Sequence, residues 1–198
     1  MKTVLSRLFA AIVLEFLLMR VVAAQPALTI KPLAEKKVEA LPTGTLYWRI
    51  ENLPTLQAAQ ASAGPLALAV EAEGKAWLFT LGAAGGSTAG ATLVTEVGPI
   101  PRIDATKYLL RINDASGPPG SVTPIHSHPG SEAFYVLTGE QSIRGEHGTL
   151  KVAAKAAEPG HGANMAMQVS SSGQSDLHAL VMFVVDADKP FSTPATLP

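Results

Sequence analysis

Short hydrophobic stretches, alternating with polar positions and separated by glycine and proline, run through most of the chain. This pattern predicts strands, because residues two apart on a strand face the same side. Many short strands joined by glycine turns are typical of an all-β sandwich or barrel, and not of a βαβ fold. The predicted strands are 46–50, 66–70, 75–81, 108–112, 133–137, 141–144, 149–153, 165–169 and 177–185.

The strands 66–70 and 75–81 form a predicted hairpin that turns at Glu73 and Gly74. Such a tight turn needs positive φ, which glycine adopts without steric cost. On the second strand the two-residue period places Trp77, Phe79 and Leu81 on one face. This hairpin is therefore expected to contribute one apolar face to a core.

Three other segments have distinct patterns. The stretch 177–185 is apolar at both alternating sets of positions, so it is expected to be buried on both faces. Residues 52–64 combine a cap, a proline and a closing glycine, which predicts a short helix. Residues 26–44 are expected to be an extended lead-in, and residues 82–90 a flexible loop.

The first 24 residues resemble an export signal. Lys2 and Arg7 precede a mostly apolar run, and small residues at 22–24 form a cleavage site. Glu15 and Arg20 interrupt the run, so an uncleaved anchor or a surface helix is the alternative. The run is short for a spanning helix, which favours a cleaved signal and a secreted or periplasmic protein. The rest of the chain has no segment long and apolar enough to span a membrane, so no membrane contact is expected of the mature form.

Composition narrows the class of function. The 198 residues are 47% hydrophobic and 16% charged, which allows a packed core. The formal net charge is −1 without any run of like charges, which argues against a nucleic-acid partner. Because the chain has no cysteine, disulfides, cysteine nucleophiles and thiolate metal sites are excluded.

The segment between Gly120 and Gly139 carries the candidate chemistry. His126 and His128 are two apart, so on a strand their imidazoles project to the same side. A proline–glycine turn follows and can bring Glu132 back to the same point. Two neutral imidazoles and one carboxylate suit Fe(II), Mn(II) and similar ions, with open positions for water or substrate.

This segment resembles the first conserved motif of the cupin superfamily, G-x5-H-x-H-x3-E-x6-G, and all five fixed positions match. The resemblance implies a double-stranded β-helix or jelly-roll barrel, often a homodimer, in which His126, His128 and Glu132 are metal ligands. It covers about residues 108–191. The expected organisation is a signal at 1–24, a β-rich extension at 25–105, a cupin barrel at 106–191 and a tail at 192–198.

The second cupin motif departs from the family pattern. When the turn at 171–173 sets the register, Met167 stands where the family has a third metal-binding histidine. A thioether is a poor ligand for hard divalent ions and a fair one for copper. Met167 and Met165 are more simply core or cavity walls on one strand face, together with Phe134. His161 can substitute if its loop folds over the barrel mouth.

The remaining histidines have simpler interpretations. His147 lies in a turn and is expected to be solvated, and His178 is expected to pair with the backbone in or near the core. The metal can be Fe, Mn, Ni, Zn or Cu, which the sequence does not distinguish.

Two functions remain open at this point. The first is a metal-dependent enzyme that acts on a small organic molecule, by dioxygenase-like oxidation or by isomerase-like chemistry. The alternative is an exported, non-catalytic module that binds a small ligand in its barrel, with a degenerate or empty metal site. A structural or storage role has less support, because it does not need the paired histidines and the glutamate.

Overall fold

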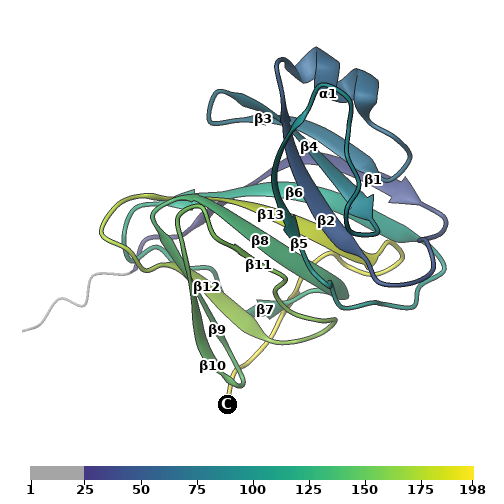
Figure 1. Cartoon of the computed structure of the whole chain (residues 1–198). Helices are drawn as coiled ribbons and strands as arrows, with labels where there is room; N and C mark the ends of the chain where they lie inside the picture. The colour runs from purple at the N-terminus through teal and green to yellow at the C-terminus, as the bar shows by residue number, and fades with distance from the viewer. Residues whose placement is uncertain (1–24) are drawn as a thin grey trace, which may run out of the picture.

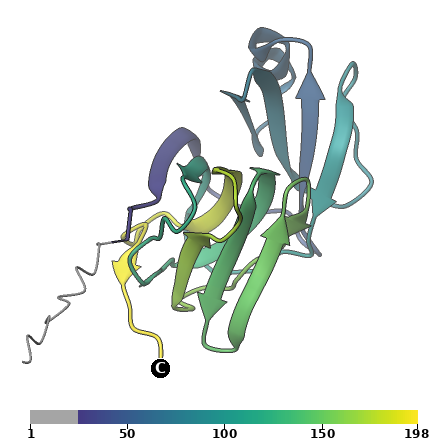
Figure 2. The ribbon, with the colours of Figure 1, turned by 90° about the vertical axis from the view of Figure 1, so that its left-hand side faces the viewer.

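The computed structural model describes residues 25–198, and the predicted export signal lies outside the described residues. This part of the chain consists of antiparallel strands and one short helix, α1 (Leu56–Ser62). The strands form three sheets, two of which enclose a barrel while the third packs against its outer side (Figures 1 and 2). The all-β class predicted from the sequence is therefore confirmed.

The first barrel sheet has five strands and holds most of the long ones. Its central strand, β13, pairs with β6 on one side and with β8 on the other. In spatial order its strands are β1 (Thr29–Val38), β6 (Tyr108–Gly117), β13 (Leu177–Asp186), β8 (Gly130–Thr138) and β11 (Ala157–Glu158).

The second barrel sheet is built from shorter strands and closes the barrel opposite the first. Apolar side chains from both sheets meet between them, among them Phe134, Ile143 and Val181. The order of its strands is β10 (Gly148–Ala153), β9 (Glu140–Gly145), β12 (Met167–Ser171), β7 (His126–Ser127) and β14 (Thr193–Pro194).

The third sheet comes from the N-terminal half and has four strands. The predicted hairpin is present, and both Glu73 and Gly74 at its turn have positive φ. Helix α1 covers the face of this sheet that points away from the barrel, and the hydroxyl of Thr55 caps its first turn. The strand order is β3 (Ala67–Ala72), β4 (Lys75–Gly82), β2 (Tyr47–Leu53) and β5 (Thr92–Val97).

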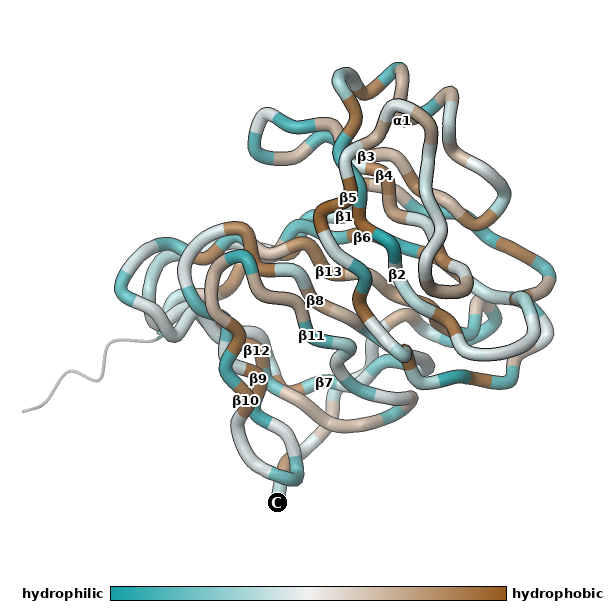
Figure 3. The backbone as a smooth tube through the Cα atoms, in the orientation of Figure 1, coloured by the Kyte–Doolittle hydropathy of each residue, from teal (hydrophilic) through white to brown (hydrophobic). Residues whose placement is uncertain are grey.

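The first barrel sheet carries a hydrophobic core on each of its faces. Phe183 and other side chains on one face fill the barrel, while Met182 and Leu110 on the other face pack against Trp48 and Phe79 of the third sheet. Hydrophobic positions accordingly follow the central strands, and hydrophilic ones gather in the outer loops (Figure 3). The prediction that 177–185 is buried on both faces is confirmed.

Besides three strands of only two residues, two longer strands were not predicted from the sequence. The lead-in at 26–44 contains β1, which pairs with β6 and so belongs to the first barrel sheet. The prolines of the lead-in argued against a strand there. However, β1 is an edge strand with a register shift at Pro32, and proline is tolerated at such a position. The strand β5 follows the flexible loop and was also missed. Pro54 precedes the N-cap of α1, outside the first turn.

Within residues 25–198, no helix is long and apolar enough to cross a membrane.

Candidate metal and ligand site

The strands β7 and β8 bring the residues of the first motif together. β7 has only two residues, and a short turn through Pro129 leads directly into β8 on the opposite sheet. Gly130 begins β8 against β13, where a Cβ atom would overlap the carbonyl oxygen of Val184. Gly130, which lies between His128 and Glu132 in the motif, therefore allows the close backbone approach that returns Glu132 to the histidines.

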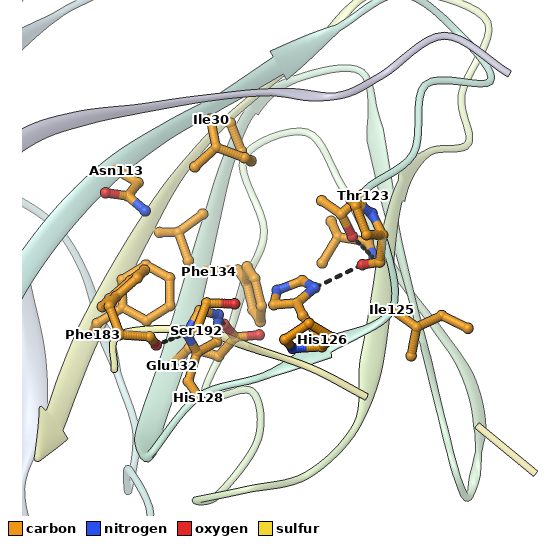
Figure 4. A pocket seen from close by; sticks show the side chains of 16 residues that line it. Ile30, Asn113, Thr123, Ile125, His126, His128, Glu132, Phe134, Phe183 and Ser192 are labelled. Atoms are coloured by element: carbon orange, nitrogen blue, oxygen red, sulfur yellow. Dashed lines mark hydrogen bonds and ion pairs between the residues drawn. The ribbon is translucent and has the colours of Figure 1, made fainter. Parts of the chain in front are cut away.

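The three predicted ligands line one cavity (Figure 4). The ring centroids of His126 and His128 are 4.9 Å apart with the rings nearly perpendicular. Nε2 of His128 lies 3.4 Å from Oε2 of Glu132. Their spacing in the sequence predicted that these side chains lie together, and in the structure they line the same cavity. Their role as metal ligands stays a prediction.

Both imidazoles are oriented by backbone carbonyls. Nδ1 of His126 is 2.8 Å from the oxygen of Pro124, and Nδ1 of His128 is 2.6 Å from the oxygen of Phe191. A carbonyl oxygen can only accept, so each Nδ1 carries the proton and donates it. Nε2 of each ring is consequently left with a free lone pair, as in histidines that bind metals.

Burial controls the charge of the cluster. Burial raises the pKa of Glu132 to about 8 and, as the main cause, lowers the pKa of His128 to about 4. The 3.4 Å contact between them is short enough for an ion pair. However, both shifts favour the uncharged forms, so at neutral pH we describe the contact as one between a protonated carboxyl and a neutral imidazole. Oε1 of Glu132 is buried and has no hydrogen-bond partner.

The cavity that contains this cluster has a volume of about 400 Å³. Its walls are mostly apolar and come from both barrel sheets, with Phe134, Val169 and Phe183 among the lining residues. A few polar side chains interrupt these walls. A concave site of this size and composition suits a small organic molecule with few polar groups.

The C-terminal segment closes one side of the cavity. Phe191 packs against the rings of His128 and Phe183, at centroid distances of 4.7 and 4.9 Å, and the guanidinium of Arg111 lies 4.2 Å from its ring centroid. The strand β14 then pairs with β7. The tail predicted at 192–198 therefore begins inside the site, because Ser192 and Pro194 line the cavity. No local motif in the sequence pointed to this segment.

The fit of a divalent ion rests on the chemistry of the donors. Among residues 25–198, no three His, Cys, Asp or Glu side chains converge closely enough to hold an ion as they stand. The donor atoms nevertheless suit a divalent ion. Nε2 of each imidazole is unprotonated, and Oε1 of Glu132 has no hydrogen-bond partner. Such an ion would be held by His126, His128 and Glu132.

Met167 occupies the place that the motif register predicted. Its Cα pairs with that of His126, so it lies beside the histidine on the neighbouring strand. Its side chain is buried in the barrel core and is not among the residues that line the cavity. Of the two expected roles, core or cavity wall, Met167 therefore has the first. Met165 precedes β12 and does not line the cavity either, so the two methionines do not share a strand face. Phe134 does line the cavity as expected.

The other histidines lie away from the cavity lining. His161 packs near Gly145, its Nδ1 is buried without a partner, and burial lowers its pKa. His147 is exposed in a turn, as predicted. Nδ1 of His178 is 3.3 Å from a carboxylate oxygen of Glu73 but makes no hydrogen bond, so the predicted backbone partner is not found at this atom.

The fold and the site define a small double-stranded β-barrel with a mixed His and Glu cluster in its cavity. Among solved structures, the chain is similar to a cupin superfamily protein from Desulfitobacterium hafniense, with 16% identity over 39% of this chain and 68% of that chain and a TM-score of 0.35. It is also similar to a protein with a double-stranded β-helix domain from Klebsiella pneumoniae, with 18% identity over 44% and 75% of the two chains and a TM-score of 0.38.

A third similar structure is the DMSP lyase DddQ from Ruegeria pomeroyi, with 21% identity, 43% of each chain covered and a TM-score of 0.38. The chain thus spans under half the length of that lyase. No family model and no curated protein matches the sequence. These likenesses concern the fold alone.

Proposed function

We propose that this protein binds a small organic molecule in its barrel cavity, at a divalent metal centre held by His126, His128 and Glu132. The observation that carries this proposal is the pair of backbone hydrogen bonds that fix both Nδ1 protons and leave both Nε2 atoms unprotonated. Because these bonds set the tautomer of each ring, the lone pairs are available before any ligand arrives.

The chain contributes orientation and exclusion of water. Phe191 and Phe183 shield His128 on two sides, and the apolar walls hold the body of the ligand next to the cluster. His126 is half-buried at the edge of the cluster. A bound divalent ion with open positions would supply Lewis-acid or redox chemistry, which suits dioxygenase-like oxidation or isomerisation of a small molecule.

Metal binding is tested by elemental analysis and equilibrium titration of the purified protein with Mn(II), Fe(II), Ni(II), Cu(II) and Zn(II). We expect about one ion per chain, and loss of that ion in His126→Ala and His128→Ala. His147→Ala is the matched control, because that histidine is exposed and remote from the cavity. An ion retained in both cavity variants would refute the ligand assignment.

A second candidate function is binding of a small ligand without a metal or catalysis. It is favoured by the largely apolar cavity and by the neutral form of Glu132. Thermal-shift measurements with small aromatic ligands, with and without the five metals, distinguish the two functions. Stabilisation by ligands in chelator, combined with no response to any metal, would support this second function.

Export and homodimer formation belong to the same proposal and rest on the sequence and the family resemblance. The mass of the N-terminus after expression with the full leader tests cleavage at residue 24. Sedimentation of the mature chain tests the dimer.

A further inference from the structure

A single buried amide lies in the cavity wall away from the histidines. Asn113 on β6 is 1% exposed and lines the cavity. In the sheet it pairs with Val181, which pairs in turn with Phe134, two residues along β8 from Glu132. Ordinary strand spacing then places the backbones of Asn113 and Glu132 about 12 Å apart. Figure 4 shows Asn113 reaching into the pocket at a distance from the cluster.

The orientation of this amide is fixed by a neighbouring arginine. Nε of Arg111 lies 2.9 Å from the side chain of Asn113. A guanidinium has only donors, so the atom that faces it must be the amide oxygen. Arg111 is itself held by the ring of Phe191 and by Glu35, 3.6 Å away. The amide therefore cannot flip without losing its bond to Arg111.

The amide nitrogen of Asn113 is available to a ligand. Nδ2 of Asn113 makes no hydrogen bond within residues 25–198, and it is not one of the fully buried polar atoms that lack a partner, so it is accessible from the cavity that the residue lines. With the oxygen committed to Arg111, the amide nitrogen faces this cavity (Figure 4). A ligand that fills the cavity removes water from these N–H groups, so it binds well only if it offers an acceptor in place of that water.

We propose that Asn113 is a specificity-determining residue, which donates a hydrogen bond to a carbonyl or carboxylate oxygen of a mostly apolar ligand in this cavity. The inference rests on the proposed function only in that the cavity binds a small molecule. It identifies the ligand class as one with an apolar body and an oxygen acceptor at the end remote from the histidines.

The test uses three probes of similar size, 4-phenyl-2-butanone, 3-phenylpropionate and butylbenzene. Their affinities are measured by calorimetry in chelator and again with the metal that the wild-type protein binds. Asn113→Leu keeps the shape but removes the donor. Asn113→Asp keeps the acceptor for Arg111 and replaces the donor with a second acceptor. Gln57→Leu is the control for the same amide-to-leucine change, because Gln57 is exposed on α1 and does not line the cavity.

We expect the wild-type protein to prefer the ketone and the carboxylate over butylbenzene. In Asn113→Leu the affinity for both oxygen-bearing probes should fall about tenfold, while that for butylbenzene changes less than threefold. Asn113→Asp should bind 3-phenylpropionate worst of all, because two acceptors then face each other. Gln57→Leu should keep the wild-type preference.

An unchanged preference in Asn113→Leu would overturn the inference, and so would absence of saturable binding of all three probes to the wild-type protein. Neither outcome bears on metal binding, which is measured separately on the same samples. Conversely, a preference that depends on Asn113 in chelator, in a protein that binds no metal, would support this inference while refuting the metal centre.

Discussion

Glu132 is the residue whose environment departs most from that of an ordinary side chain. It is buried beside a neutral imidazole, and one of its oxygens has no partner. Without an ion, the carboxyl is stable there only in its protonated form, because burial penalises its charge. Stability should therefore depend on pH in a way that reports on this one residue.

The direction of this pH dependence follows from the two residues whose pKa values are shifted. Glu132 has its pKa raised from 4.5 to about 8, so the folded state holds the proton longer, and stability falls as pH rises between these values. His128 has its pKa lowered from 6.5 to about 4, so stability rises with pH between about 4 and 6.5. The two effects oppose each other below pH 6.5, and only that of Glu132 is left above it.

We predict that the metal-free protein loses about 2 kcal/mol of unfolding free energy between pH 6.5 and 8, and that Glu132→Gln abolishes this loss. Denaturant unfolding in chelator at several pH values measures it. Glu146→Gln, at an exposed position, is the control and should retain the loss. An identical fall in Glu132→Gln would contradict the assignment of the effect to this carboxyl.

At the scale of elements, the contact between β8 and β13 positions the site. Gly130 lies where the two strands are closest, and a side chain there would meet the backbone of Val184 and Val185. Backbone atoms in a central strand cannot move aside at low cost, since β13 is held by strands on both sides and by a core on each face.

Gly130→Ala should therefore destabilise the fold by about 3 kcal/mol or more, through overpacking against β13. Chemical denaturation gives the change in free energy. Gly64→Ala is the matched control, because a Cβ atom there meets nothing within 4 Å and its stability should change by less than about 0.5 kcal/mol. Equal effects of the two substitutions would show that the close approach is not important.

The sequence predicted those features that are determined by residues close together in the chain. The turn at Gly74, the double burial of 177–185 and the spacing of His126, His128 and Glu132 all follow from two-residue periodicity and turn chemistry. The strand β1 was missed, because its proline, Pro32, is acceptable only at a sheet edge, which is a property of the assembled sheet. Phe191 and Asn113 were missed for the same reason: each joins the site through contacts distant in sequence.

At the scale of the whole molecule, the third sheet and the barrel share one core. Trp48, Phe79 and Met182 pack in the same cluster, although they come from two different sheets. Residues 25–105 therefore do not form an independently packed unit, since their apolar face is buried only against the first barrel sheet. The two parts are expected to unfold together.

Phe79→Ala, in the third sheet, should lower the stability of the entire described chain by about 3 to 5 kcal/mol. Calorimetry should show one transition that shifts as a whole, with the barrel following the N-terminal sheet. Leu93→Ala is the control, because Leu93 lies on the same sheet but is 55% exposed. Two separate transitions, of which only one shifts, would contradict the shared core.

The backbone and the side chain of Phe191 have different roles in the site. Its carbonyl oxygen holds His128 in position through the backbone, whereas its side chain shapes the wall of the cavity. Any residue at this position offers the same carbonyl oxygen, so a change of side chain alters the packing against His128 but leaves this hydrogen bond in place. Exchange of the side chain here can thus alter which molecules the barrel accepts, while the backbone hydrogen bond that orients His128 is kept.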